Sequence, residues 1–284
     1  MIYLKVALYV IGFILIFSLL VFLLSIYPFK FKGIGHSPDQ LGYKYENISF
    51  TTKDGILLKG WLLPHEKSKS IVIIGHGYPF DKANIFAATH WLASDFNLLY
   101  FDFRYFGESS GSYTTSGAKE KEDALAAIEF AKKHGYKKIG LYGFSMSAAA
   151  FLLAESKDVN VIVVDSTYAS LDNMIKDQYF IFPWITKLPF VWAEKLYAFL
   201  FFGTNTAAVS PANSLSRTNV PVLIIHGDRD TQISVENAYQ LYEKSNKSNT
   251  ELWIIKGADH GQAIHINEKD YKRKVRDFLK QKLE

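Results

Sequence analysis

A serine, an aspartate and a histidine, each placed after a short apolar run, could together carry out nucleophilic catalysis in this chain. Ser145 follows the apolar run 138–142 and precedes the small-residue run 148–150, a pattern that predicts a sharp turn between a strand and a helix. Such a turn holds a serine in a strained backbone that exposes its hydroxyl group, so Ser145 is the candidate nucleophile. A serine hydroxyl group needs a base, a carboxylate that orients the base, and donors for the oxyanion.

The base and the carboxylate that Ser145 needs are available in two later loops. Asp230 lies in the loop after the apolar run 222–225, and His260 lies in a loop of small residues after the run 251–255. Asp228 is a second candidate for the acid. The nearby Asp259 is interpreted as a loop-stabilising residue, and two further histidines are interpreted as structural residues: His76 and His226. The order serine, aspartate, histidine along the chain is that of the α/β-hydrolases.

Eight strand-like segments are predicted to position these residues. Two of them alternate in polarity around an Asp-Gly turn and predict a hairpin: 45–51 and 56–63. The others are short apolar runs typical of strands covered on both faces: 70–74, 97–101, 139–142, 161–164, 222–225 and 251–255. Helix-length stretches lie between them: 82–94, 119–134, 146–156, 235–245 and 268–282. This alternation predicts an α/β fold with a mostly parallel, doubly wound sheet of about eight strands and a site at the carboxyl ends of the strands.

The connection from residue 166 to residue 219 is too long for a simple crossover and predicts an inserted cap of short helices at about 169–215. It is rich in aromatic residues: Tyr179, Phe180, Phe182, Trp184, Phe190, Trp192, Tyr197, Phe199, Phe201 and Phe202. Charged residues and prolines interrupt the segment, which argues against a second membrane span. Three interpretations of the aromatic residues stay open: they line an acyl pocket, contact the surface of a bilayer, or pack against the main sheet.

The N-terminal segment is predicted to be a membrane anchor. No charged residue occurs from Val6 to Tyr27, and a helix of that length reaches roughly 33 Å, enough to cross a hydrocarbon core. A cleaved signal peptide would have a shorter apolar region and an Ala-x-Ala-like site, which 24–28 does not offer. We therefore expect an anchor at 1–28, a linker at 29–44 and one catalytic domain at 45–284. The basic residues near the span are Lys5 before it, and Lys30, Lys32 and Lys44 after it. This distribution slightly favours a cytoplasmic catalytic domain but does not fix its side of the membrane.

Composition argues against several other functions. The net charge is +4, and the basic residues are scattered apart from the run 272–274, which is typical of the solvated face of a helix, so no nucleic-acid partner is expected. The absence of cysteine excludes disulfides, a thiolate nucleophile and cysteine-ligated zinc. The histidines show no paired metal-ligand spacing, and no glycine-rich phosphate loop or dinucleotide fingerprint lies between a strand and a helix. Neither a metal nor a cofactor is expected.

From about Tyr45 to its end, the chain resembles the α/β-hydrolase superfamily, and in particular its membrane-anchored Bem46-like branch and the serine aminopeptidase-like, S33-type domains. The resemblance is carried by four features: the oxyanion-type loop 75–78, the loop 102–111, the strand end 165–168, and the loops that hold Asp230 and His260. It implies that the backbone N–H groups of Tyr78 and Met146 form the oxyanion hole, that the loop 102–111 is structural, and that Asp230 rather than Asp228 is the acid. Ser147 departs from the family pattern, which has glycine there.

These observations predict a membrane-anchored serine hydrolase that cleaves a carboxylic ester or thioester through an acyl-Ser145 intermediate, with His260 as base and Asp230 as its orienting carboxylate. The expected partners are a small-molecule or lipid-like acyl substrate and the bilayer. One alternative is an aminopeptidase-like peptidase, which would need acidic residues over the site, for which the cap offers three candidates: Asp172, Asp177 and Glu194. The other is a non-catalytic binding protein, although such proteins usually lack a member of the triad.

Overall fold

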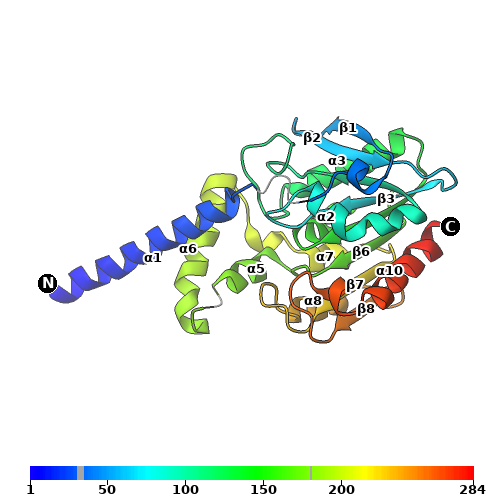
Figure 1. Cartoon of the computed structure of the whole chain (residues 1–284). Helices are drawn as coiled ribbons and strands as arrows, with labels where there is room; N and C mark the ends of the chain where they lie inside the picture. The colour runs from blue at the N-terminus through cyan, green and yellow to red at the C-terminus, as the bar shows by residue number, and fades with distance from the viewer. Residues whose placement is uncertain (31–34, 180) are drawn as a thin grey trace.

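One sheet of eight strands organises the computed structural model, which describes residues 1–30, 35–179 and 181–284 (Figure 1). The strands are β1 (Glu46–Thr51), β2 (Leu57–Leu63), β3 (Ser70–Gly75), β4 (Asn97–Phe101), β5 (Lys138–Phe144), β6 (Val161–Asp165), β7 (Val222–Gly227) and β8 (Thr250–Ile255). Their order is β1-β2-β4-β3-β5-β6-β7-β8; β2 pairs antiparallel with β1 and β4, and the remaining neighbours are parallel. The predicted α/β-hydrolase sheet is confirmed. Two residues used in the sequence analysis, Lys32 and Phe180, lie outside the described residues.

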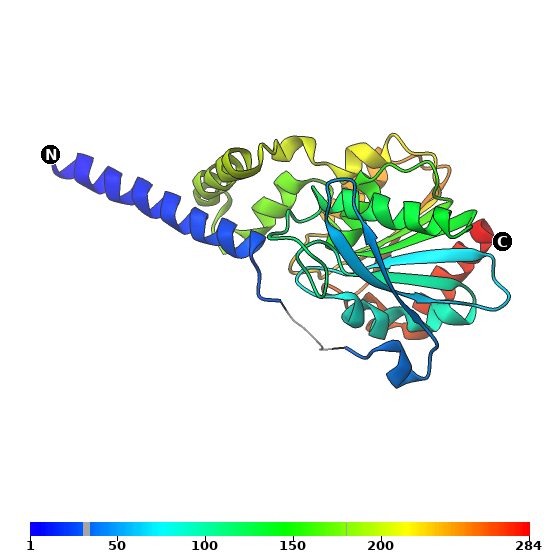
Figure 2. The same cartoon turned by 90° about the horizontal axis from the view of Figure 1, so that it is seen from above.

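Helices cover both faces of the sheet, which explains the continuous apolar runs of its central strands (Figure 2). One face packs against α3 (Glu120–Lys133), α4 (Met146–Leu153), α7 (Pro211–Leu215) and α8 (Glu236–Lys244). The other face packs against α2 (Lys82–Thr89), the 3₁₀ turn η2 (His90–Ser94), α9 (Ala263–Ile266) and α10 (Glu268–Leu283). A further 3₁₀ turn, η1 (Pro38–Leu41), precedes β1. The predicted helix at 82–94 is therefore divided into α2 and η2.

The N-terminal helix α1 (Ile2–Ile26) projects away from the sheet (Figures 1 and 2). Of the helices in the described ranges, α1 is the one that is long and apolar enough to cross a membrane, and only 11% of its apolar stretch is buried inside the protein. A helix that is apolar on all sides and mostly exposed is typical of a segment surrounded by lipid.

The inserted segment after β6, called the cap below, holds α5 (Leu171–Gln178), α6 (Trp184–Phe202) and the 3₁₀ turn η3 (Thr206–Ala208), and it leads into α7, which packs on the sheet. Helix α6 is longer than the short helices expected here, although it contains Pro189. It packs against α1: the ring of Phe190 lies edge-on to Phe17 at 5.6 Å, and Phe202 lies 5.9 Å from Phe22. These aromatic residues therefore contact the N-terminal helix instead of the sheet, since α1 offers the apolar surface that lies beside α6.

Candidate active site

Ser145 lies at the turn between β5 and α4 with φ 53° and ψ −114°. This left-handed conformation is rare for a residue with a side chain and holds the hydroxyl group clear of the sheet. The backbone N–H of Ser145 donates to the carbonyl of Asp165 at 2.8 Å, and its own carbonyl accepts from the Thr167 hydroxyl group at 2.9 Å. A Cβ atom on Gly143 would stand 2.5 Å from Cα of Ala148, so the close approach of strand and helix requires glycine at that position.

The departure from the family pattern at Ser147 is accommodated by a glycine on the neighbouring strand. A Cβ atom on Gly75 would lie 2.5 Å from Cβ of Ser147, so the space taken by the serine is left free by Gly75. The Ser147 hydroxyl group donates to the carbonyl of Phe144 at 2.9 Å and accepts from the N–H of the same residue at 2.8 Å. Ser147 therefore braces the turn that presents Ser145.

The structure brings Ser145, His260 and Asp230 into one hydrogen-bonded chain. His260 Nε2 lies 3.1 Å from Ser145 Oγ, and His260 Nδ1 lies 2.7 Å from Asp230 Oδ2. Because an ionised carboxylate only accepts hydrogen bonds, the Nδ1–H of His260 donates to Asp230 and Nε2 is left to accept the proton of Ser145. This arrangement can activate a serine hydroxyl group as a nucleophile.

Asp230 is held as a buried carboxylate. Its other oxygen accepts from the backbone N–H groups of Gln232 at 2.9 Å and Ile233 at 2.7 Å. Burial alone would raise the pKa of Asp230, but hydrogen bonds from His226 and His260 lower this pKa overall. Asp230 is therefore ionised at neutral pH and able to stabilise a protonated His260.

His226, interpreted from the sequence as a structural histidine, also contacts the proposed acid, which the sequence did not predict. Its Nε2 lies 2.8 Å from the carbonyl of Ile233 and 3.3 Å from Asp230 Oδ2, so its N–H faces the same carboxylate as His260. The sequence showed only a histidine before a glycine at a strand end. Its role depends on how the loop after β7 folds back, and no local spacing signals that.

The other polar residues considered around the site have different partners. Asp228 accepts from the backbone N–H of Gly257 at 2.5 Å and so joins two loops. Asp259 accepts from the backbone N–H groups of Thr231 at 2.8 Å and His260 at 2.7 Å. His76 is fully buried; it hydrogen-bonds through Nδ1 to the carbonyl of Gly77 at 2.9 Å and accepts from the Phe103 N–H at Nε2 at 3.0 Å, and burial lowers its pKa.

A pocket of about 260 Å³ opens over Ser145 and His260, and both predicted oxyanion residues line it: Tyr78 and Met146. Met146 is the first residue of α4, so its N–H has no acceptor within the helix and lies at the positive end of the helix dipole. The rim of the pocket includes Met174, Asp177 and Gln178 from the cap, and Ser25 from α1. A contribution from the N-terminal helix was not predicted.

The three acidic cap residues lie in different surroundings. Asp172 forms an ion pair with Lys195 at 2.7 Å, and Glu194 of α6 is buried and lines a second, smaller cavity. Asp177 lines the main pocket, and burial raises its pKa. Asp177 is therefore the one acidic residue of these three that faces the proposed reaction site.

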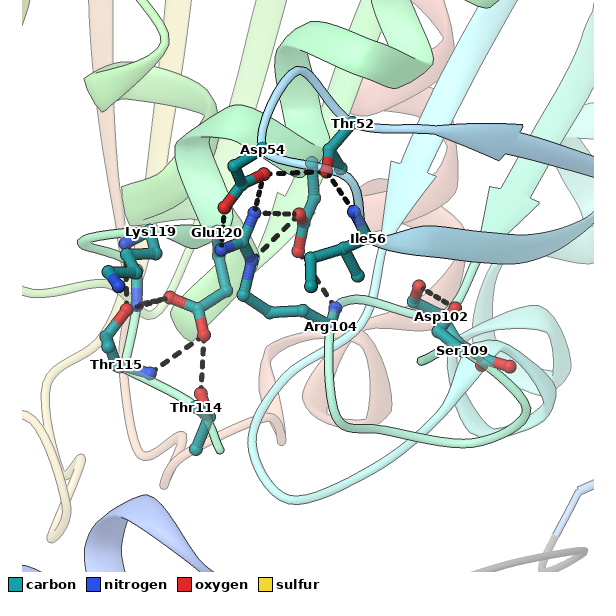
Figure 3. Close-up of polar contacts among 12 residues, drawn as sticks. Thr52, Asp54, Ile56, Asp102, Arg104, Ser109, Thr114, Thr115, Lys119 and Glu120 are labelled. Atoms are coloured by element: carbon teal, nitrogen blue, oxygen red, sulfur yellow. Dashed lines mark hydrogen bonds and ion pairs between the residues drawn. The ribbon is translucent and has the colours of Figure 1, made fainter. Parts of the chain in front are cut away.

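Two polar networks hold the loop 102–111 and the segment that contains Thr114 and Thr115 (Figure 3). Arg104 binds Asp123 at 2.7 Å and Asp54 at 2.7 Å, which ties the loop 102–111 to α3 and to the β1–β2 turn. Glu120 accepts from the hydroxyl groups of Thr114 at 2.6 Å and Thr115 at 2.7 Å. These contacts give the loop 102–111 the structural role that the resemblance implies. In the described part of the chain, no cluster of three or more histidine, aspartate or glutamate side chains could hold a metal ion.

A sequence profile of the prolyl oligopeptidase family matches residues 87–284, more than two thirds of the chain. The chain belongs to the prolyl oligopeptidase family. Within the α/β-hydrolases, this family member is also similar to a solved esterase of Pyrococcus furiosus, with 31% identity, a TM-score of 0.73, and coverage of 91% of this chain and 100% of the esterase. These similarities confirm the predicted α/β-hydrolase fold and make the chain a serine hydrolase by class.

Two further proteins are similar to this member of the prolyl oligopeptidase family. A membrane protein of Saccharomyces cerevisiae is 24% identical over 90% of this chain and 88% of its own length. A thiohydrolase of Arthrinium phaeospermum is 32% identical over 42% of this chain and 41% of its own length. The similarity to a membrane protein agrees with a membrane-anchored branch of the superfamily.

Proposed function

We propose that this protein is a membrane-anchored serine hydrolase that cleaves a carboxylic ester or thioester through an acyl-Ser145 intermediate. The observation that carries the proposal is the position of His260, whose two ring nitrogens lie 3.1 Å from Ser145 Oγ and 2.7 Å from Asp230 Oδ2. The esterase and the thiohydrolase among the similar proteins support the same substrate class. In this proposal 1–28 is the anchor, 29–44 the linker and 45–284 the hydrolase domain, with the cap at about 169–215.

The proposed reaction has two steps. Ser145 Oγ attacks the acyl carbonyl carbon as its proton moves to His260 Nε2, and the N–H groups of Tyr78 and Met146 stabilise the oxyanion. The intermediate collapses, the bond to the alcohol or thiol breaks, and the leaving group takes the proton from His260. Water then attacks the acyl-Ser145 ester while His260 accepts its proton, and the carboxylic acid leaves as the proton returns to Ser145.

A fluorophosphonate probe tests the nucleophile directly, because it modifies only an activated serine. We expect covalent labelling of the wild-type chain in membranes and none of Ser145→Ala. Ser216→Ala is the matched control, because its hydroxyl group bonds to the carbonyl of Asn213, away from the site. Labelling that persists in Ser145→Ala would contradict the assignment.

An aminopeptidase-like peptidase is the second candidate, and the position of Asp177 in the pocket favours it specifically. A carboxylate there could bind the ammonium group of a free amino terminus. Comparing p-nitrophenyl acyl esters with aminoacyl p-nitroanilides separates the two functions. We expect faster turnover of the esters; faster turnover of the anilides, lost in Asp177→Asn, would favour the peptidase.

A further inference from the structure

Helix α6 presents an apolar face to its surroundings, next to α1. Its exposed large side chains are all hydrophobic: Trp184, Ile185, Leu188, Trp192, Leu196, Phe199, Leu200 and Phe201. The charged residues of α6 turn toward the protein, where Lys187 donates to the carbonyl of Lys176, Lys195 pairs with Asp172, and Glu194 is buried. Such a large exposed surface without charge is typical of a face covered by lipid or by another protein.

The position of α6 along α1 favours lipid. Helix α6 crosses α1 (Figures 1 and 2). Tyr197 donates to the carbonyl of Leu15 at 2.8 Å, and Phe190 packs against Phe13 and Phe17. A span of about 20 residues is needed to cross the hydrocarbon core. The possible 20-residue spans within α1 run from 2–21 to 7–26, so each contains 7–21 and with it Phe13, Leu15 and Phe17, which contact α6. If α1 crosses a bilayer, α6 lies at the depth of its acyl chains.

The carboxyl end of the same helix reaches the catalytic pocket. Ser25 lines that pocket together with Ser145 and His260. The chain around Ser25 is fixed to the hydrolase domain by three hydrogen bonds to its carbonyl groups: from the Tyr78 hydroxyl group to Leu24 at 3.2 Å, from the Thr114 N–H to Ile26 at 3.0 Å, and from the Tyr105 hydroxyl group to Pro28 at 2.8 Å. The pocket is therefore bordered by the point at which the predicted anchor ends.

A narrow crevice continues from the pocket toward α6. It has a volume of about 40 Å³ and shares Ser25, Ser116 and Met174 with the main pocket. Beyond them it is bordered by apolar side chains of both helices, including Phe22 of α1 and Ala198 of α6, and by the buried carboxyl group of Glu194. Met174 has an unbranched, flexible side chain, and its rotation can widen the connection between the two cavities.

We infer that the acyl group transferred to Ser145 comes from a lipid dissolved in the bilayer, and that its hydrocarbon chain is held in the crevice between the end of α1 and the cap. The inference rests on the proposed hydrolysis of an ester or thioester at Ser145 and names the substrate class. Water and a lipid acyl ester give a fatty acid and the free alcohol, or the thiol from a thioester. The apolar face of α6 keeps the pocket at the membrane surface from which such a substrate enters.

The chain-length preference of the full-length protein in phosphatidylcholine vesicles tests this inference. We expect kcat/KM to be at least tenfold higher for p-nitrophenyl palmitate in the bilayer than for soluble p-nitrophenyl butyrate. Ala198→Trp fills the crevice and should lower this ratio about tenfold. Ala208→Trp, which adds the same side chain to the exposed η3 turn, should leave the ratio unchanged.

The outcomes separate this inference from the proposed function. Two results would overturn the lipid substrate alone. One is a wild type that is labelled by the fluorophosphonate and turns over butyrate but shows no preference for palmitate. The other is an Ala198→Trp variant that is still labelled and keeps the wild-type ratio of palmitate to butyrate turnover. If the wild type is not labelled and turns over no ester, the proposed function and this inference are overturned together. If Ala198→Trp does not fold, the wild-type preference still decides.

The depth of α6 can be measured independently of activity. Trp184 and Trp192 lie on its exposed face, 70% and 68% exposed. In vesicles of phosphatidylcholine with brominated acyl chains, we expect tryptophan fluorescence to be quenched, and the quenched fraction to be lost in Trp184→Phe/Trp192→Phe but kept in Trp253→Phe. Equal quenching in the double variant, or none in the wild type, would place α6 outside the bilayer and favour a protein partner or a second copy on this face.

Discussion

At the scale of single residues, the proposed activity depends on the tautomer of His260. Asp230→Asn places an amide N–H₂ group or a neutral oxygen opposite Nδ1, so that Nδ1–H is no longer held against a carboxylate. We expect kcat for an ester substrate to fall about 10³- to 10⁴-fold, with a smaller effect on KM. Steady-state kinetics with a p-nitrophenyl ester measure this change.

Asp228→Asn is the matched control for that prediction. Asp228 bonds to the N–H of Gly257 and not to His260, so this variant should keep kcat within a few-fold of the wild type. A loss in Asp228→Asn as large as in Asp230→Asn would mean that the acid had been assigned wrongly.

The proposed triad residues could be predicted from sequence because each follows a strand whose apolar run is visible. The contribution of His226 could not be predicted in the same way, since its contact with Asp230 needs a loop that folds back from Gly227 to Ile233. Ser25 gave no signal either. Its place in the pocket depends on the docking of α1, which is a long-range contact.

At the scale of elements, the nucleophile turn depends on a pair of small residues on adjacent segments. Gly75→Ala would place a Cβ atom 2.5 Å from Cβ of Ser147, which forces β3 and α4 apart. We expect the free energy of unfolding to fall by about 1–3 kcal/mol and fluorophosphonate labelling to slow. Thermal denaturation in detergent, followed by loss of labelling, measures the change.

A second substitution isolates the cause of that effect. Gly75→Ala/Ser147→Gly removes the opposing atom, so the double variant should recover most of the lost stability, as measured in a double-mutant cycle. If Gly75→Ala lowers the free energy of unfolding equally whether residue 147 is serine or glycine, the two side chains do not compete for space.

The β1–β2 turn contributes a pH-dependent part of the stability. The ion pair with Arg104 lowers the pKa of Asp54 to about 2, below its ordinary value of 3.8. Because the folded state holds the ionised form, this stabilisation is present above pH 4 and is lost as the pH falls toward 2. The difference in free energy of unfolding between the wild type and Asp54→Asn should therefore be constant near neutral pH and shrink below pH 4. A difference that grows at acidic pH would contradict this linkage.

The elements of the sheet followed from the sequence more closely than those of the cap. Each predicted strand lies within two residues of an observed one, because two-sided burial leaves a continuous apolar run in six of them and the other two alternate around an Asp-Gly turn. Helix α6 was expected as short pieces, since Pro189 and three charged residues interrupt its sequence. Packing against α1 buries Phe190 and Ala198 and turns those charges inward, and sequence periodicity alone does not reveal such a partner.

At the scale of the whole molecule, the anchor, the cap and the catalytic pocket form one connected unit. The predicted anchor supplies Ser25 to the pocket and Phe22 to the packing with α6, and its end is bonded to the loop of Tyr78. If α1 spans a membrane, a change in its position there would therefore act on the proposed oxyanion loop. Removal of α1 should affect catalysis as well as location.

The membrane role of α1 can be tested at two positions of the helix that do not pack against the cap. A Cβ atom on Gly12 would meet nothing within 4 Å, and Ile16, one turn later, is 72% exposed, so Gly12→Arg/Ile16→Arg should leave the hydrolase domain folded. An arginine at the centre of a span costs about 2.5–3.5 kcal/mol of insertion free energy. The arginine double variant should therefore move from the carbonate-resistant membrane pellet to the supernatant. The control Gly12→Leu/Ile16→Leu should stay in the pellet. If the arginine variant remains in the pellet as completely as the leucine variant, α1 does not hold the protein in the membrane, and the depth assigned to α6 loses its basis.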